Sequence, residues 1–317
     1  MMFKKINSKY IIQEIFNYID LIRVLELVRY NKDIKNKLEV SKKNYEKIFN
    51  QIQIEIYPKD NLEFKANEQN IFINFLGGKN YYHIFFDDND EEIDRNYIQK
   101  GEQIKKIKIM IEPEFNSLSG LFKDCKCIKE IRFTKFNRTD IINMKEMFYG
   151  CHSLTKINFS HFNTDNVTNM SNMFMQCSKL EALEALDVST FNTSNVTDMS
   201  FMFSQCSTIK DLDLSNFNTA KVSEMVCMFF ACTKLEKLNL SSFNFDNVLH
   251  MKGMFNFCCS LIDLDFPQTH LDNATDSKCI FNFCKSELLL MLILRNPNLI
   301  SKNVWGISSD KLDIPQH

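Results

Sequence analysis

Hydrophobic residues recur through most of this chain in a unit of nearly constant length. A phenylalanine within a Met-Phe-x-x-Cys-like phrase marks each unit, and successive phenylalanines are 26, 26, 29, 26, 26 and 26 residues apart. They are Phe122, Phe148, Phe174, Phe203, Phe229, Phe255 and Phe281. The cysteines keep the same spacing: Cys125, Cys151, Cys177, Cys206, Cys232, Cys258 and Cys284. This regularity predicts a repeat architecture in which each unit packs against its neighbours.

The first half of each unit has a helical period. Met170, Met173, Phe174 and Cys177 are spaced as i, i+3, i+4 and i+7, which predicts one buried face of a short helix. Hydroxyl side chains precede these segments, where they can accept the free amides of a helix start. These residues are Thr168, Thr197 and Ser223.

The second half of each unit alternates between apolar and polar positions. Leu212–Ser215 reads LDLS and Leu238–Ser241 reads LNLS, which predicts short strands. Equivalent strands of successive units are expected to pair in parallel, with Ile104–Ile111 supplying an eighth strand at the start. Asparagines follow the turn phenylalanines and are expected to bond nearby backbone groups. They are Asn137, Asn163, Asn192, Asn218 and Asn244.

The repeated cysteines are predicted to pack as small apolar groups. A column of equivalent thiols, one in each unit, indicates a packing role for these cysteines. A catalytic role would instead need one special cysteine beside a base. The count of eleven is odd, which favours reduced thiols over disulfides. Redox sensing and metal binding remain alternatives, although no second ligand pair stands at zinc spacing.

The joint pattern L-x-x-L-x-L-S-x-F-N-T-x-x-V-x-x-M-x-x-M-F-x-x-C is best seen in Ile209–Cys232 and Leu235–Cys258. It resembles the BspA-type leucine-rich repeat, and the matching stretch runs from about Leu118 to Leu294. This resemblance implies a solenoid used for binding, often in surface or adhesion proteins. We therefore expect an α/β fold: a leucine-rich-repeat solenoid of stacked parallel strands and short helices, preceded by a small helical N-terminal domain.

The N-terminal segment has its own helical stripe, and Glu14–Leu38 is similar to an F-box. That resemblance implies helices that dock on a Skp-type adaptor of a ubiquitin ligase. The candidate adaptor-binding residues are Ile15, Phe16, Ile19, Leu25 and Val28. The alternative is a plain helical cap over the first repeat.

Four segments are expected. Residues 1–56 form the helical, F-box-like domain, and 57–103 form a hairpin or linker that caps the repeats. The hairpin is predicted from IFINFLGG and YYHIFF, joined through Gly77 and Gly78. Residues 104–294 form the solenoid, and 295–317 form a C-terminal cap or tail.

Composition narrows the function. A net charge of −2 disfavours sequence-independent nucleic-acid binding, and no apolar run is long enough for a signal peptide or membrane span. A cytoplasmic location without membrane insertion is therefore expected. Six scattered histidines and the lack of a Gly-rich phosphate loop disfavour an enzyme, and no cofactor or metal is expected.

The outward position between the apolar strand residues is polar in six successive units. It holds Arg132, Asn158, Asp187, Asp213, Asn239 and Asp265. We expect this strip either to be a solvated strand face or to bind a protein partner of basic character. The predicted function is a non-enzymatic protein–protein interaction scaffold. The alternatives are an F-box-like substrate receptor of a ubiquitin ligase and a BspA-type surface adhesin.

Overall fold

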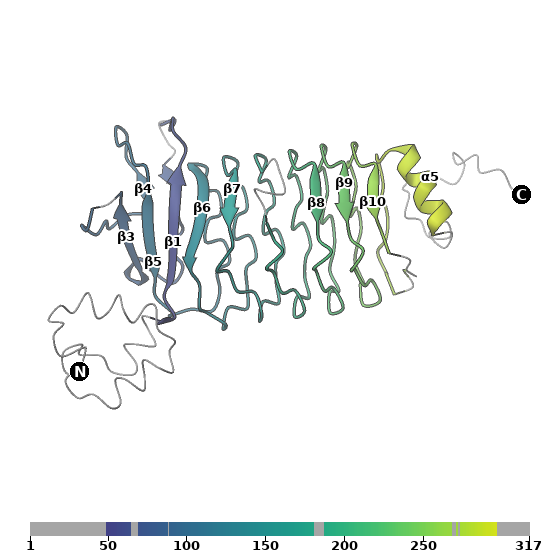
Figure 1. Cartoon of the computed structure of the whole chain (residues 1–317), viewed down its shortest axis with the longest axis horizontal. Coiled ribbons are helices and arrows are strands. Elements are labelled where there is room, and N and C mark those ends of the chain that lie inside the picture. The colour runs from purple at the N-terminus through teal and green to yellow at the C-terminus, as the bar shows by residue number, and fades with distance from the viewer. Residues whose placement is uncertain are drawn as a thin grey trace, which may run out of the picture.

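The computed structural model describes residues 49–64, 69–87, 89–180, 187–267, 271 and 273–296. These residues form an elongated body in which the labelled strands lie side by side along the long axis (Figure 1). Three sheets contain all of the named strands in these ranges, and the α-helix α5 (Ser286–Arg295) lies at the C-terminal end.

The largest sheet is mixed and has the order β3-β5-β1-β6-β7. Its strands are β1 (Ile52–Pro58), β3 (Tyr82–Phe86), β5 (Ile107–Ile111), β6 (Ile128–Lys135) and β7 (Lys156–Asn158). The central strand β1 pairs antiparallel with both β5 and β6, whereas β6 pairs parallel with β7. Strand β1 alternates between buried and half-buried residues, as a strand with one face on the core does.

The other strands are short. Strands β8 (Asp211–Asp213), β9 (Lys237–Asn239) and β10 (Asp263–Asp265) form a parallel sheet of three. Strands β2 (Asn70–Ile71) and β4 (Tyr97–Ile98) form an antiparallel pair, and the 3-10 helix η2 (Lys79–Tyr81) precedes β3. Isolated parallel bridges link further units, for example Asn143 to Asn169 and Asn169 to Asp198.

The segments with helical spacing form turns instead of helices. Asn172 and Gln176 have φ angles of 59° and 64°, in the left-handed region where a right-handed helix cannot continue. Some backbone amides in these turns bond to the next unit, as Phe174 N donates to the carbonyl of Met202 over 2.9 Å, and others bond within the turn, as Met173 N donates to the carbonyl of Met170 over 3.2 Å. The expected helix is therefore wrong, although the residues that share its apolar face are all buried.

The hydroxyls expected to cap these helices have another partner. Thr168 Oγ1 donates to the carbonyl of Ile142 over 3.1 Å, and Thr197 Oγ1 donates to the carbonyl of Thr168 over 3.2 Å. They therefore bond the preceding unit. The expectation for the turn asparagines is confirmed at Asn218, whose Oδ1 accepts the amide of Ala220 at 3.1 Å.

The core is built from columns of like residues. The repeat phenylalanines stack in sequence order, with neighbouring ring centroids 5.1 to 5.7 Å apart and planes within 11° of parallel. All seven rings are buried, so each ring is excluded from water by its neighbours. Offset aromatic stacking of this kind adds to the free energy of burial.

The predicted fold class is wrong. We expected an α/β solenoid with one continuous stack of parallel strands and a short helix in each unit. The structure instead has turns in place of those helices and three separate sheets, the largest of them mixed. The expected first parallel strand is β5, which pairs antiparallel with β1 and β3. The predicted hairpin is also wrong, because β2 and β3 belong to different sheets. The expected helical N-terminal domain falls on residues 1–56, of which 1–48 lie outside the described residues.

Candidate functional site

Strands β8, β9 and β10 place equivalent side chains side by side. Their register aligns Asp211, Lys237 and Asp263 in one row. It aligns Asp213, Asn239 and Asp265 in another row. The leucines between these rows are at most 3% exposed, so the pleat directs the two polar rows to the opposite, outer side.

The two rows line a shallow concavity of about 450 Å³. We call its six polar residues, in the two rows just given, the acidic strand face. It carries four carboxylates and one ammonium group, whereas the whole chain has nearly balanced charge. Neighbouring parallel strands are about 4.8 Å apart, so these carboxylates create a locally negative surface.

Part of the predicted partner-binding strip also stabilises turns. Asp213 Oδ1 accepts the amide of Ser215 at 2.9 Å, and Asn239 Oδ1 accepts the amide of Ser241 at 3.0 Å. This is the bond by which Asp and Asn side chains commonly hold a turn two residues on. The serine two positions after each of these strip residues is the sequence signal for the bond, and the strand alternation alone does not reveal it.

The same turn bond occurs at two other strip residues. Asn158 Oδ1 accepts the amide of Ser160 at 2.8 Å, and Asp187 Oδ1 accepts that of Ser189 at 2.9 Å. Side-chain and backbone hydrogen bonds from Ser189 hold the pKa of the Asp187 carboxyl below its usual value. Asp265 cannot accept the same turn bond, because the residue two positions on is Pro267, which has no amide hydrogen.

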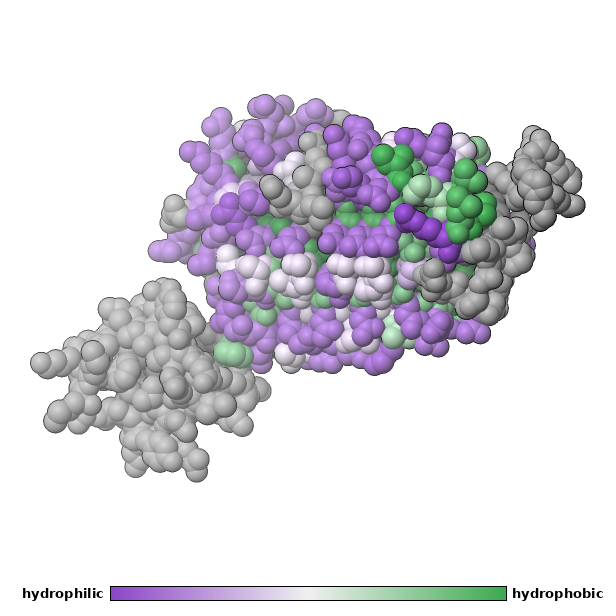
Figure 2. Space-filling model, turned by 45° about the vertical axis from the view of Figure 1, so that its right-hand side comes forward, coloured by the Kyte–Doolittle hydropathy of each residue, from purple (hydrophilic) through white to green (hydrophobic). Residues whose placement is uncertain are grey.

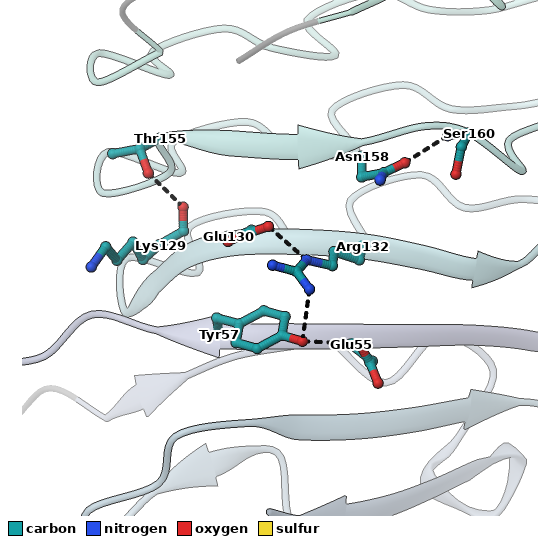
Figure 3. Close-up of polar contacts among 8 residues, drawn as sticks. All are labelled: Glu55, Tyr57, Lys129, Glu130, Arg132, Thr155, Asn158 and Ser160. Atoms are coloured by element: carbon teal, nitrogen blue, oxygen red, sulfur yellow. Dashed lines mark hydrogen bonds and ion pairs between the residues drawn. The ribbon is translucent and has the colours of Figure 1, made fainter. Parts of the chain in front are cut away.

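Arg132 belongs to a separate network (Figure 3). Its Nε donates to Glu130 over 2.7 Å and its Nη1 donates to the Tyr57 hydroxyl over 3.2 Å. The guanidinium carbon lies 4.5 Å from the centre of the Tyr57 ring. Tyr57 in turn donates to Glu55 over 3.0 Å. Arg132 and Asn158 are neighbours in register, but the arginine is engaged with β1 and so is not part of the acidic strand face.

A second cleft, of about 680 Å³, lies beside β1. Its charged lining residues are balanced, three basic and three acidic: Lys59, Lys105, Lys129, Asp60, Glu102 and Glu130. Lys129 Nζ is paired with Asp60 at 3.0 Å, which neutralises part of this lining. A balanced cleft gives no electrostatic preference for a class of ligand, so the acidic strand face is the stronger candidate.

The repeat cysteines are held as neutral thiols. The Sγ of Cys177 donates to the carbonyl of Phe148 over 3.1 Å, and that of Cys232 donates to the carbonyl of Phe203 over 3.1 Å. Burial raises the pKa of the Cys232 thiol to about 12 and that of Cys177 well above its ordinary value. A thiol with a raised pKa is a poor nucleophile, so the prediction of a packing role is confirmed for these residues.

The described ranges offer no metal centre and no membrane-spanning helix. No group of three or more His, Cys, Asp or Glu side chains in the described ranges could hold a metal ion. No helix in the described part of the chain has the length and apolar character to cross a bilayer. The candidate adaptor-binding residues Ile15, Phe16, Ile19, Leu25 and Val28 lie outside the described residues.

Comparison with known families gives one result. Residues 116–210 and 179–288 match the family described as "Mycoplasma protein of unknown function, DUF285". The two matches overlap and together span the repeats and the acidic strand face. No curated protein and no solved structure matches the chain.

Proposed function

We propose that this chain, which belongs to the DUF285 family, is a non-enzymatic protein–protein interaction scaffold. Its partner binds on the acidic strand face. Because the family description assigns no function, the proposal is drawn from the surface of this chain alone.

The carboxylates of the acidic strand face carry the proposal. Within the described part of the chain, the side chains of Asp211, Asp263 and Asp265 form no hydrogen bond or ion pair. Asp213 uses one carboxylate oxygen for the turn and keeps the other for a partner. These groups lie in a concavity, so an approaching cation meets several carboxylates at once.

The partner that fits is an extended segment of a protein with lysine or arginine side chains. Such a segment can lie across three strands and pair its cations with the carboxylates of both rows. Lys237 stands between Asp211 and Asp263, where it disfavours a cation at the centre of that row. This arrangement restricts where a partner's basic residues can lie, so it supplies specificity as well as attraction.

Comparative capture from a lysate of the producing cells tests this function. A variant with Asp211, Asp213, Asp263 and Asp265 all changed to asparagine removes the charge of the face. In this variant the new amide side chain at position 213 can still accept the turn amide, as Asn239 does in its own unit. We expect the wild-type chain to retain a basic protein that this variant does not retain.

A matched control removes the same charge elsewhere. It changes Asp90, Asp94 and Asp246 to Asn and Glu91 to Gln, all of them outside the acidic strand face. We expect this control to retain the same protein as the wild type. Equal retention by all three chains would contradict the proposal.

The alternative functions stay predictions. The substrate-receptor hypothesis depends on N-terminal residues outside the described ranges, and no described feature favours the adhesin over the scaffold.

A further inference from the structure

Helix α5 has an apolar outer face. It buries Leu288 and Leu292, each 2% exposed, against the core. On the other side, Leu290, Met291 and Leu294 are 60%, 45% and 73% exposed. Hydrophobic side chains gather toward the end of the molecule that carries α5, on a surface that is otherwise mostly hydrophilic (Figure 2).

These three residues form a continuous stripe with Glu287. The four positions are i, i+3, i+4 and i+7, which lie on one face of an α-helix. We call Glu287, Leu290, Met291 and Leu294 the outer stripe of α5. Contiguous exposed apolar residues of this kind commonly mark an interaction surface.

Charges stand at the two ends of the outer stripe. Glu287 is in the first turn of α5 and Arg295 is in the last turn. Eight residues of helix separate them by about 12 Å, too far to pair within one helix. Met291 lies midway between these two charged residues, so the apolar residues are centred between an acidic and a basic end.

We propose that the outer stripe binds a second copy of this chain, with the two α5 helices packed antiparallel about a two-fold axis. Such an axis at the level of Met291 places Glu287 opposite Arg295 of the partner subunit, and the reverse pair forms at the other end. A parallel arrangement would instead bring like charges together. The antiparallel arrangement also sets opposite ends of the helix dipoles beside each other.

Charge complementarity is what selects a second copy as the occupant. A rotation by 180° brings each charged end of the stripe opposite an end of opposite charge on the second copy. A partner of unrelated sequence would not in general carry charges in this arrangement. The pairing does not depend on the acidic strand face. It would nevertheless present two such faces in one assembly and so strengthen binding to any multivalent partner.

Sedimentation of the full chain over a wide concentration range tests the pairing. We expect a monomer–dimer equilibrium that Leu290→Asp with Leu294→Asp abolishes while the melting temperature is kept. Leu249→Asp is the control, because Leu249 is an exposed leucine outside α5. It should leave the dimer unchanged. A chain that is monomeric throughout, or a dimer that survives the double change, would overturn the proposal.

Charge exchange tests the antiparallel geometry. Glu287→Arg alone and Arg295→Glu alone should each weaken the dimer by about tenfold, because two attractive pairs become repulsive. Both changes together restore opposite charges across the axis and should restore dimerisation. If the double variant were as weak as the single variants, the antiparallel assignment would be wrong.

Discussion

The Sγ atom of Cys206 donates to the carbonyl oxygen of Phe174 over 3.0 Å, across 32 residues of chain. Equivalent pairs such as Cys177 and Phe148 are 29 residues apart, at 3.1 Å. The three additional residues belong to the long unit, in which Leu-Glu-Ala occurs twice between Leu180 and Ala185. The thiol column therefore keeps its register through an insertion, which shows that this bond is a constant feature of the packing.

The thiol column predicts a steep loss of stability in alkali. Burial raises the pKa of each thiol in the folded chain, to about 12 for Cys232 and Cys284. Such a thiol contributes fully to the free energy of unfolding below its pKa in the unfolded chain, about 8.5. This contribution is lost as the pH rises toward the pKa of the thiol in the folded chain. One pH unit above 8.5, each thiol should cost about 1.4 kcal/mol.

Denaturant unfolding between pH 7 and 10 under reducing conditions measures this loss. Cys206→Ala removes one thiol of the column, so the slope of the unfolding free energy against pH should fall by up to about 1.4 kcal/mol per unit. The comparison concerns the slope, because the alanine also leaves a cavity that lowers stability at every pH. An unchanged slope would show that the thiols are accessible in the folded state.

Thiol accessibility gives a second prediction. Cys259 is exposed, whereas Cys151, Cys177 and Cys206 are buried. Brief alkylation of the native chain, followed by mass spectrometry, should modify Cys259 first and leave the column unmodified. Modification of the column at the same rate as Cys259 would contradict the packing assignment.

The phenylalanine column predicts a large cost for truncation. Phe203 is fully buried, and its ring centre lies 5.5 Å from that of Phe174 and 5.7 Å from that of Phe229. Phe203→Ala should lower the unfolding free energy by roughly 3–5 kcal/mol. Asp213→Asn is the control, since it alters an exposed residue and preserves the turn bond. Similar losses for the two variants would refute the assignment of inner and outer faces.

The turn bond of Asp213 distinguishes two substitutions at one position. Asp213→Asn keeps an oxygen that can accept the amide of Ser215, whereas Asp213→Ala removes it. We expect the alanine variant to be less stable than the asparagine variant by about 1 kcal/mol. Thermal unfolding of both proteins measures the difference, and equal melting temperatures would mean that the bond contributes nothing.

The spacing of residues was sufficient to identify the columns and the inner and outer positions. Leu212 and Leu238 are buried and Asp213 is exposed, as the alternation predicts. The helical spacing around Phe174 was misleading, because a turn with left-handed residues at Asn172 and Gln176 buries the same side chains. Periodicity records which residues face inward and does not report the backbone hydrogen bonds.

The N-terminal sheet could not be predicted from the repeat. Strand β1 lies outside the repeated sequence, yet it inserts between β5 and β6 and pairs Ile54 with both Ile109 and Phe133. Alternating isoleucines show that a strand has a buried face, but they do not specify its neighbours. For the candidate site, the polar rows were predictable, while the turn bonds and the engagement of Arg132 with Tyr57 depend on three-dimensional contacts.

The affinity of the captured basic partner for the acidic strand face, measured at low and high salt, tests the central claim most directly. The wild-type chain should bind it with an affinity that falls as salt screens the carboxylates. The variant with all four aspartates of the face changed to asparagine should bind it at least about tenfold more weakly, a loss of about 1.4 kcal/mol, with little remaining salt dependence. Equal affinity and equal salt dependence for the two chains would show that the partner binds elsewhere.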